Sequence, residues 1–168
     1  MRRAGPADAG RLSLLGGATF LLAFAHDHPG DALVDHVAKE HSVERYSALL
    51  ADPDCAIWLV ETTLGAPIAY AVMTPPEVDC AHDASDLELK RIYVLDPWRG
   101  GGWGETLISA VQEEARHRGA RRLLLCVYTS NLSAQRFYAR QGFADTGYGQ
   151  QFYVGAIAFD DRIWAKAL

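Results

Sequence analysis

A cluster of glycines between a strand-like and a helix-like segment constrains this sequence more than any other feature. Leu87 to Leu95 has the pattern of a strand, and Arg99 to Gly104, in which four of six residues are glycine, follows closely. Apolar side chains then recur at three- and four-residue spacing until Gly119, as on one face of a helix. Leu123 to Tyr128 is a continuous apolar run, typical of a strand covered on both faces. The segments predict a strand, a glycine loop, a helix and a mid-sheet strand in succession.

The remaining segments predict a mixed architecture of α/β or α+β class around this unit. We expect helices at residues 7–20 and within 32–50, strands at 56–61 and 66–74 joined as a hairpin, a helix that ends at Gly142, and late strands within 143–159. At 168 residues the chain fits one domain, and no linker, internal repeat or low-complexity block interrupts it. We therefore predict a single domain over residues 1–168.

The charge balance argues against some classes of partner. The chain has 21 acidic and 16 basic residues, so a nucleic acid loses the attraction that dominates such binding. A small cationic substrate suits the net charge of −5 better. The apolar run at 19–25 is too short to span a membrane, and the start of the chain lacks the pattern of a signal peptide. We expect no nucleic-acid partner, no membrane and a cytoplasmic location.

The cysteines and histidines give no sign of a disulfide or a metal site. Cys55, Cys80 and Cys126 are odd in number, far apart and without CxxC spacing. His26 and His28 flank Asp27, but no further ligand residue stands at a recurring distance from them. We expect reduced cysteines and no metal.

The glycine loop can bind an anion through its backbone. Residues without Cβ let consecutive N–H groups converge on one phosphate, and the free N–H groups at the start of the next helix add to that attraction. A P-loop is excluded, because no lysine follows the glycines, and a dinucleotide fingerprint fits badly, because Leu107 occupies the third glycine position. From the glycines alone, a flexible surface turn is the alternative.

Two motifs resemble the GNAT superfamily of N-acetyltransferases. The first, Arg99-x-x-Gly102-x-Gly104 preceded by Ile92-Tyr93-Val94 and Pro97, is similar to the acyl-CoA signature of that superfamily. The second, Asn131-x-x-Ala134-x-x-Phe137-Tyr138-x-x-x-Gly142-Phe143, is similar to its following strand and helix motif. Arg2 to Ala4 with Asp8 also resembles the first strand and helix of these proteins. The resemblance spans nearly the whole chain.

The resemblance implies a fold and a cosubstrate. The fold is a mixed, mostly antiparallel sheet of six or seven strands with about four helices, splayed where the glycine-loop strand and the next strand part. The cosubstrate is acetyl-CoA. The implied binding residues are Ile92, Tyr93 and Val94, whose backbone pairs with the pantetheine arm, and Arg99, Gly100, Gly101, Gly102, Trp103 and Gly104, whose amides take the pyrophosphate. Gly101, where a Lys or Arg is common, and Trp103, where an aliphatic residue is usual, are departures that remove no amide.

The same resemblance implies direct transfer of the acetyl group to an amine. Tyr138 matches the general acid that protonates the CoA sulfur, although its helical face also suits packing in the core. Asn131 suits both the cap of its helix and a cofactor contact. Glu88 is our candidate for the base that receives the amine proton, because it heads the strand whose other end meets the thioester. The alternative for Glu88 is an exposed strand charge paired with Lys90.

Several features bear on the acceptor without naming it. The helix region and loop where members of this superfamily bind acceptors carry seven acidic residues, namely Asp27, Asp31, Asp35, Glu77, Asp79, Asp83 and Asp86. These suit either a polyamine or a plain solvated face. Residues 160–168 resemble bacterial spermine/spermidine acetyltransferases over a short stretch. We expect a small-molecule amine or polyamine acceptor, with a protein amine as a further option, and a homodimer as the default assembly.

Two other functions stay open at this point. A GNAT-fold protein that binds acyl-CoA for regulation, without efficient turnover, carries the same motifs. A non-enzymatic interaction domain uses the exposed-looking Trp98 and Trp103 as partner contacts.

Overall fold

A seven-stranded sheet runs through the molecule in the order β1-β2-β3-β4-β5-β7-β6. The computed structural model describes residues 1–80 and 82–168. The strands are β1 (Arg2–Arg3), β2 (Ala56–Glu61), β3 (Pro67–Thr74), β4 (Asp86–Val94), β5 (Arg122–Tyr128), β6 (Ala144–Val154) and β7 (Ile157–Ala167). The α-helices are α1 (Ala9–Phe24), α2 (Gly30–Glu40), α3 (Val43–Ala51), α4 (Trp103–His117) and α5 (Leu132–Arg140).

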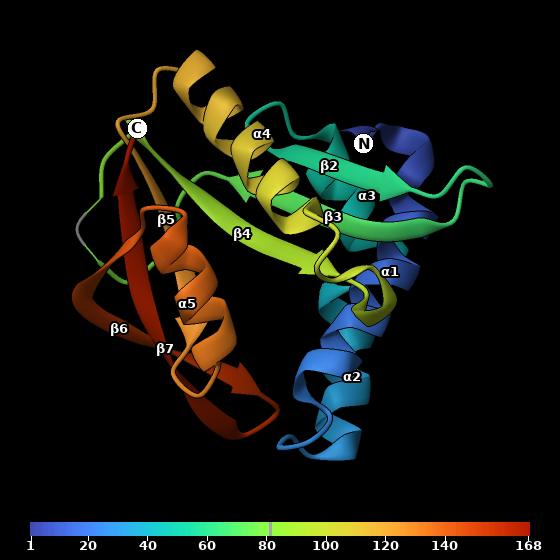
Figure 1. The fold of residues 1–168 in the computed structure, drawn as a ribbon. Helices are drawn as coiled ribbons and strands as arrows, with labels where there is room; N and C mark the ends of the chain where they lie inside the picture. Colours follow the sequence, from blue (N-terminus) through green and yellow to red (C-terminus); the bar gives the residue numbers. More distant parts are fainter. Residues whose placement is uncertain (81) are drawn as a thin grey trace.

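The sheet is splayed between β4 and β5. These two strands are parallel and pair only from Asp86, opposite Arg122, to Glu88, opposite Leu124, while every other neighbouring pair of described strands is antiparallel. Beyond Glu88 the strands diverge, and the two halves of the sheet stand apart like the arms of a V (Figure 1). The predicted fold class, a mixed and mostly antiparallel sheet that parts after the glycine-loop strand, is confirmed.

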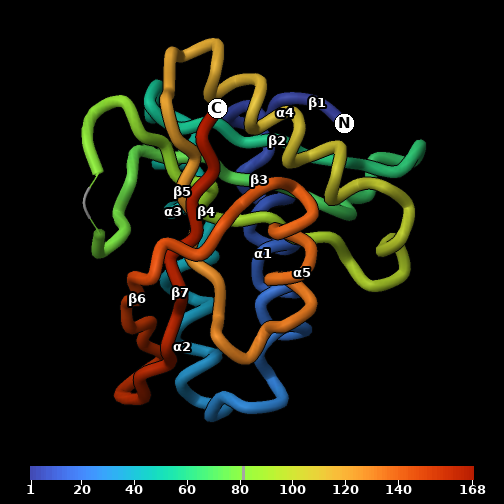
Figure 2. Tube along the Cα trace, turned by 60° about the vertical axis from the view of Figure 1, so that its left-hand side comes forward, coloured from blue at the N-terminus to red at the C-terminus, as the bar shows by residue number. Residues whose placement is uncertain are grey.

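The strands β1 to β4 form the larger half of the sheet, and helices cover both of its faces (Figure 2). On β2, Ile57 and Leu59 pack against α1 and α3, whereas Trp58 and Val60 belong to the core beneath α4 and α5. The alternation of strand side chains therefore supplies two cores, and this is why β2 and β3 carry continuous apolar sequences instead of alternating ones.

A third, smaller core joins α1 and α2 to the far end of the sheet. Phe20 of α1, Leu33 of α2 and Val154 of β6 are buried together. This contact brings the helical end of the larger half against the β6–β7 hairpin, so the mouth of the V is bounded on both sides (Figure 1).

The observed elements extend two of the predicted ones. The first helix continues to Phe24, four residues beyond the expected end at 20, and a 3-10 turn at Pro6–Asp8 takes its first residues. The late strands continue to Ala167, so residues 160–168 lie almost entirely in β7 and not in a separate tail. The hairpin of β2 and β3 and the mid-sheet position of β5 are confirmed. Within the described ranges, no helix is long and apolar enough to cross a membrane.

Candidate active site

A cavity of about 860 Å³ occupies the space between the splayed strands. Eleven of the twelve residues expected at the site line it, namely Glu88, Ile92, Tyr93, Val94, Arg99, Gly100, Gly102, Trp103, Gly104, Asn131 and Tyr138. The exception is Gly101, which is exposed and lies outside the lining. The splay therefore brings together segments that are up to 50 residues apart, since Glu88 and Tyr138 face one space.

The glycine loop presents a row of free amides to this cavity. Gly100 and Gly102 have φ values of 79° and 78°, a left-handed conformation that favours glycine. Within the described chain, the backbone N–H groups of residues 100–105 donate no hydrogen bond. The first hydrogen bond of the helix runs from the Thr106 N–H to the carbonyl of Gly102, the residue just before α4. Gly104 allows close approach of α5, because a Cβ there would lie 3.3 Å from the Phe137 ring. The loop thus has a defined conformation with free amides at the start of a helix, an arrangement that suits an anion, and it is not simply a flexible turn.

The side chains of the loop are less available than its backbone. The Arg99 guanidinium bonds Asp96 (Nε–Oδ1, 3.0 Å) and the Val94 carbonyl (3.3 Å), which ties the loop to the end of β4. Trp103 is partly buried, contrary to its exposed-looking position in the sequence, because it is the first residue of α4 and packs against the core. Trp98 is exposed, as its position in the sequence suggested.

The second half of β4 offers a free strand edge to the cavity. Ile92, Tyr93 and Val94 pair with β3 on one side, but no residue of β4 after Glu88 pairs with β5 on the other. The register with β3 shifts between Val72 and Met73, so β4 carries a bulge that redirects the side chains that follow. An extended ligand with amide groups can add to this edge as a further strand does.

Tyr138 lies on the α5 side of the cavity with its hydroxyl unengaged. Its ring packs edge-to-face against Phe137 (5.4 Å) and Phe143 (5.9 Å), so the residue also serves the core. The hydroxyl makes no hydrogen bond with any described residue. Burial raises the pKa of Tyr138, which therefore keeps its proton at neutral pH. Nearby, Asn131 caps α5 by accepting a hydrogen bond from the Ala134 amide (3.0 Å) and also lines the cavity.

Glu88 is buried, contrary to the alternative of an exposed strand charge. Its side chain is 2% exposed. Glu88 is the last residue of β4 that pairs with β5, and the loop before β4 folds over it. The ion pair with Lys90 is present (3.2 Å), and the other carboxylate oxygen accepts the Glu77 amide (2.7 Å). Both oxygens of Glu88 thus already have protein partners.

The seven acidic residues expected near the acceptor do not form one acidic face. Asp83 and Asp86 pair with Arg121 and Arg122 of the strand β5 region at 2.6 Å each and hold the loop in place. Of the seven, Glu77 alone lines the cavity, where it pairs with Lys90 (3.0 Å). Among the described residues, no group of three or more His, Cys, Asp or Glu is arranged to hold a metal ion.

Asp161 is the cavity residue that the sequence analysis missed. It lies on β7 directly opposite Tyr128 of β5, and its carboxylate has neither an ion pair nor a hydrogen bond with any described residue. Burial, with the nearby Asp160 as second cause, raises the pKa of Asp161 to about 6. The sequence could have indicated that Asp161 points inward, because in a strand Phe159, Asp161 and Ile163 lie on one face. The adjacent Asp160 made the segment look like a polar turn instead.

A buried series of hydrogen-bonded side chains behind β4 was likewise not indicated by the sequence. His41 Nδ1 lies 3.1 Å from the Tyr46 hydroxyl, which donates to the Tyr70 hydroxyl (3.2 Å), and the Arg91 guanidinium lies over the Tyr46 ring. Burial, followed by the Arg91 charge, lowers the pKa of His41 to about 3, so this histidine is neutral at physiological pH. This series supports the strand that borders the cavity.

Comparison with known proteins identifies the family. The model of the acetyltransferase (GNAT) family matches residues 22–143. An uncharacterized N-acetyltransferase of Mycobacterium tuberculosis is 31% identical over 161 residues, 96% of this chain and 98% of that protein. The aminoglycoside N(6')-acetyltransferase type 1 of Serratia marcescens is 29% identical over 120 residues, 70% of this chain and 78% of that protein. In fold, the PaiA N-acetyltransferase of Thermoplasma acidophilum, solved with coenzyme A, has a TM-score of 0.79 at 16% identity, covering 99% of this chain and 97% of that one. This chain belongs to the acetyltransferase (GNAT) family.

Proposed function

We propose that this protein transfers the acetyl group of acetyl-CoA to the primary amine of a small molecule, by direct attack in a ternary complex. The observation that carries the proposal is the shared cavity, in which free loop amides, a free strand edge and a protonated, unengaged tyrosine face one space. We further propose a cytoplasmic setting, which the three free cysteines support.

The residues present fit the cosubstrate. The amides of residues 100–105 suit the pyrophosphate, since they have no other partner in the described chain and lie at the positive end of α4. The edge of β4 at Ile92 to Val94 suits the amides of the pantetheine arm, and an N–H group there suits the thioester oxygen. Asn131 borders the same space and completes the proposed binding set.

The reaction needs a neutral amine, a polarised carbonyl and a proton for the departing thiolate. Tyr138 is the proposed general acid, because burial keeps its phenol protonated where it faces the cavity. A carboxylate of the cavity receives the amine proton, and Glu88 is the candidate that the sequence suggests. The Serratia marcescens relative, by its name, acts on an aminoglycoside, which supports a small-molecule amine over a protein amine.

The first prediction is that acetyl-CoA binds and is consumed. A ligand at about 100 times its Kd adds roughly 2.7 kcal/mol to the folded state, so we expect millimolar acetyl-CoA to raise the Tm by several degrees. A panel of primary amines, polyamines and aminoglycosides, with CoA thiol release as readout, should then show turnover. A raised Tm without thiol release from any amine supports a regulatory acyl-CoA-binding protein. An unchanged Tm contradicts the proposed site altogether.

A further inference from the structure

We propose, on the basis of the proposed function, that Asp161 binds the ammonium group of the acceptor and takes its proton. We also propose that the acceptor is a monoamine on an aromatic or similarly flat apolar body. The two statements rest on the same part of the cavity, which lies on the α1 and α2 side of the splayed sheet.

Asp161 stands on the face of the sheet opposite to Tyr138. The Tyr138 ring packs with Ile92 and Val94 beneath α4 and α5. Asp161, by contrast, faces away from α4 and α5, since Ile163 on the same face of β7 packs with Leu124 and Val78 in a separate cluster, whereas Leu123 and Leu125 of β5 belong to the core beneath α4. A thioester lying in the splay therefore has the proposed acid on one side and the Asp161 carboxylate on the other. This is the arrangement that attack by an amine from the α1 side requires.

Among the described carboxylates near the β6–β7 end of the cavity, Asp161 is the one without a cation. Three other carboxylates line the same end, and each already has a cation: Glu40 lies 3.5 Å from Arg91, and Glu77 and Glu88 share Lys90. The charged and titratable groups that act on Asp161 are Asp160 on its own strand, Lys90 and Tyr93 on β4, and Cys126 on β5, with Tyr128 as its direct cross-strand partner. A half-buried carboxylate without a partner among the described residues favours one bound cation.

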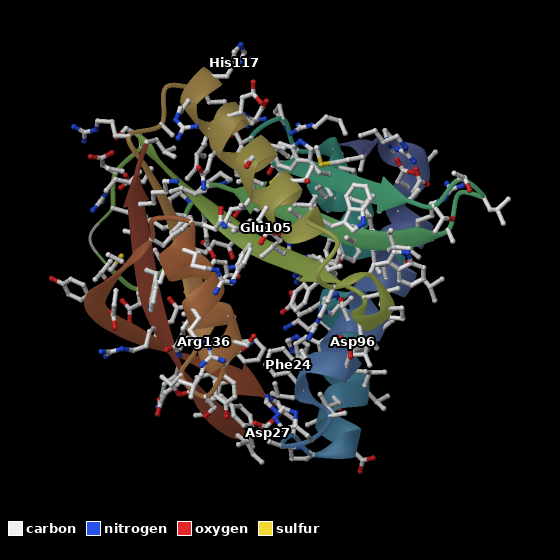
Figure 3. The ribbon with its side chains drawn as sticks, viewed as in Figure 1. Phe24, Asp27, Asp96, Glu105, His117 and Arg136 are labelled. Atoms are coloured by element: carbon white, nitrogen blue, oxygen red, sulfur yellow. The ribbon has the colours of Figure 1, made fainter. Side chains whose placement is uncertain are left out.

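Aromatic rings surround this carboxylate. Tyr128, Phe152 and Phe159 line the cavity from β5, β6 and β7, and Phe159 and Asp161 are two residues apart on one face of β7. Phe24 enters from the end of α1, between the two halves of the molecule (Figure 3), and its ring lies 6.2 Å from that of Tyr128. Because these side chains are only partly buried, they leave ring surface to the cavity. A flat apolar body fits between them.

His28 holds Phe159 and Tyr128, two of these aromatic residues, in place. Its ring stacks on Phe159 (3.7 Å between centroids), and its Nδ1 lies 2.5 Å from Asp27, which also accepts the Tyr128 hydroxyl (3.1 Å). The Nε2 atom of His28 is buried and has no partner among the described residues. Asp27 is therefore occupied with these contacts and does not offer a second free charge to the acceptor.

The charges of the cavity disfavour a polycation. Lys90 and Arg91 lie near the amine position, and the paired carboxylates leave one site for an ammonium group. Asp161 also lines a neighbouring groove, whose other charged residues are Glu77, Asp79, Asp160 and Arg162. The remaining charges of a polyamine would have to lie in that groove, so a polyamine is the competing acceptor that the experiment must include.

The proton balance of the transfer is complete with these residues. The C–N bond forms and the C–S bond breaks. Of the three ammonium protons, one stays on the amide nitrogen, one passes to Asp161 and then to solvent, and one replaces the proton that Tyr138 gives to the sulfur. Glu88, with both oxygens engaged, holds Lys90 and is a positioning residue in this scheme.

The test compares Asp161→Asn with Asp160→Asn and Glu88→Gln, using acetyl-CoA and 2-phenylethylamine between pH 5 and 9. In the wild type, kcat/KM should rise as pH passes about 6, where Asp161 ionises. In Asp161→Asn, the rise of kcat/KM near pH 6 should be absent, and kcat/KM at pH 7 should be about 100-fold lower than in the wild type. The difference should shrink as pH approaches the amine pKa of about 10, because solvent then supplies the neutral amine. Asp160→Asn, which removes the same charge one residue away at an exposed position, should keep kcat/KM at pH 7 within about twofold and move the limb to slightly lower pH, because Asp160 raises the pKa of Asp161; Glu88→Gln should keep the limb. The Tm of Asp161→Asn at pH 8 should equal or exceed that of the wild type, because a buried unpaired charge is removed.

The amine panel completes the test. We expect kcat/KM for 2-phenylethylamine to exceed that for spermidine and putrescine by at least about tenfold. Loss of the pH 6 limb in Glu88→Gln but not in Asp161→Asn overturns the assignment of the base, and a preference for spermidine overturns the acceptor class. Absence of turnover with every amine in the wild type, with no Tm shift by acetyl-CoA, contradicts the proposed function itself, and the inference falls with it.

Discussion

Replacing Tyr138 by Phe should lower kcat by about 10²–10⁴, the usual contribution of a positioned general acid. Tyr138 lines the cavity, its hydroxyl makes no hydrogen bond with a described residue, and burial raises its pKa, so at neutral pH it is a proton donor. The ring contacts with Phe137 and Phe143 survive the change, so the fold and the KM for acetyl-CoA should stay nearly constant. Steady-state kinetics of thiol release would measure the effect.

A tyrosine away from the cavity provides the control for this variant. Tyr148 of β6 is 57% exposed and does not line the cavity, so Tyr148→Phe should keep wild-type kcat. The defect of Tyr138→Phe should also shrink with acyl donors whose leaving thiols are more acidic, because those thiolates need less help from an acid. Wild-type turnover in Tyr138→Phe would instead mean that water or another group protonates the thiolate.

Replacing Gly102 by Asp should abolish the stabilisation by acetyl-CoA, which is about 2.7 kcal/mol at 100 times the Kd. The new carboxylate would stand at the N-terminus of α4, where it repels the pyrophosphate and competes for the same amides. The left-handed φ of 78° makes the change cost some backbone strain, but an added Cβ meets nothing within 4 Å and an aspartate at a helix N-terminus is favourable, so the fold should persist. Thermal unfolding with and without acetyl-CoA is the measurement.

Gly119 offers a closely matched control at the other end of the same helix. Its φ is 77°, against 78° for Gly102, and an added Cβ there also meets nothing within 4 Å. Gly119→Asp therefore carries the same backbone strain but lies outside the cavity, and it should retain the full Tm shift. An undiminished shift in Gly102→Asp would show that the loop does not hold the pyrophosphate.

Local patterns predicted the elements of this fold well where the pattern was long and apolar. The strand at Ala56–Glu61 has the predicted bounds, and β5 lies mid-sheet as its continuous apolar run indicated. The extent of β7 was less accessible, because Asp160 and Asp161 interrupt the apolar pattern while backbone pairing with β5 and β6 continues past them. Strand length there is set by tertiary pairing and not by local propensity.

The environment of the carboxylates could not be predicted from the sequence. Glu88 and Asp161 are both acidic strand residues with a basic residue within two positions, Lys90 and Arg162 respectively. The sequence suggested the Lys90 pair for Glu88, but it did not show that Glu88 is buried or that Asp161 stays without a cation. Glu88 is engaged because the loop before β4 brings the Glu77 amide to it and the bulge brings Lys90. Asp161 is free because its neighbours across the strands are Tyr128 and Gln150, which bring no cation.

The sequence by itself determined the glycine loop, the helix it starts, the position of Tyr138 on α5 and the membership of a family, because each depends on residues close together in the chain. Only the tertiary structure decided that β4 and β5 part after Glu88 and that the two carboxylates and the tyrosine face one cavity. It also decided which carboxylate is left without a partner. Burial and charge pairing depend on groups that the fold brings together from more than 70 residues apart, such as Lys90 and Asp161, and no local pattern records that proximity.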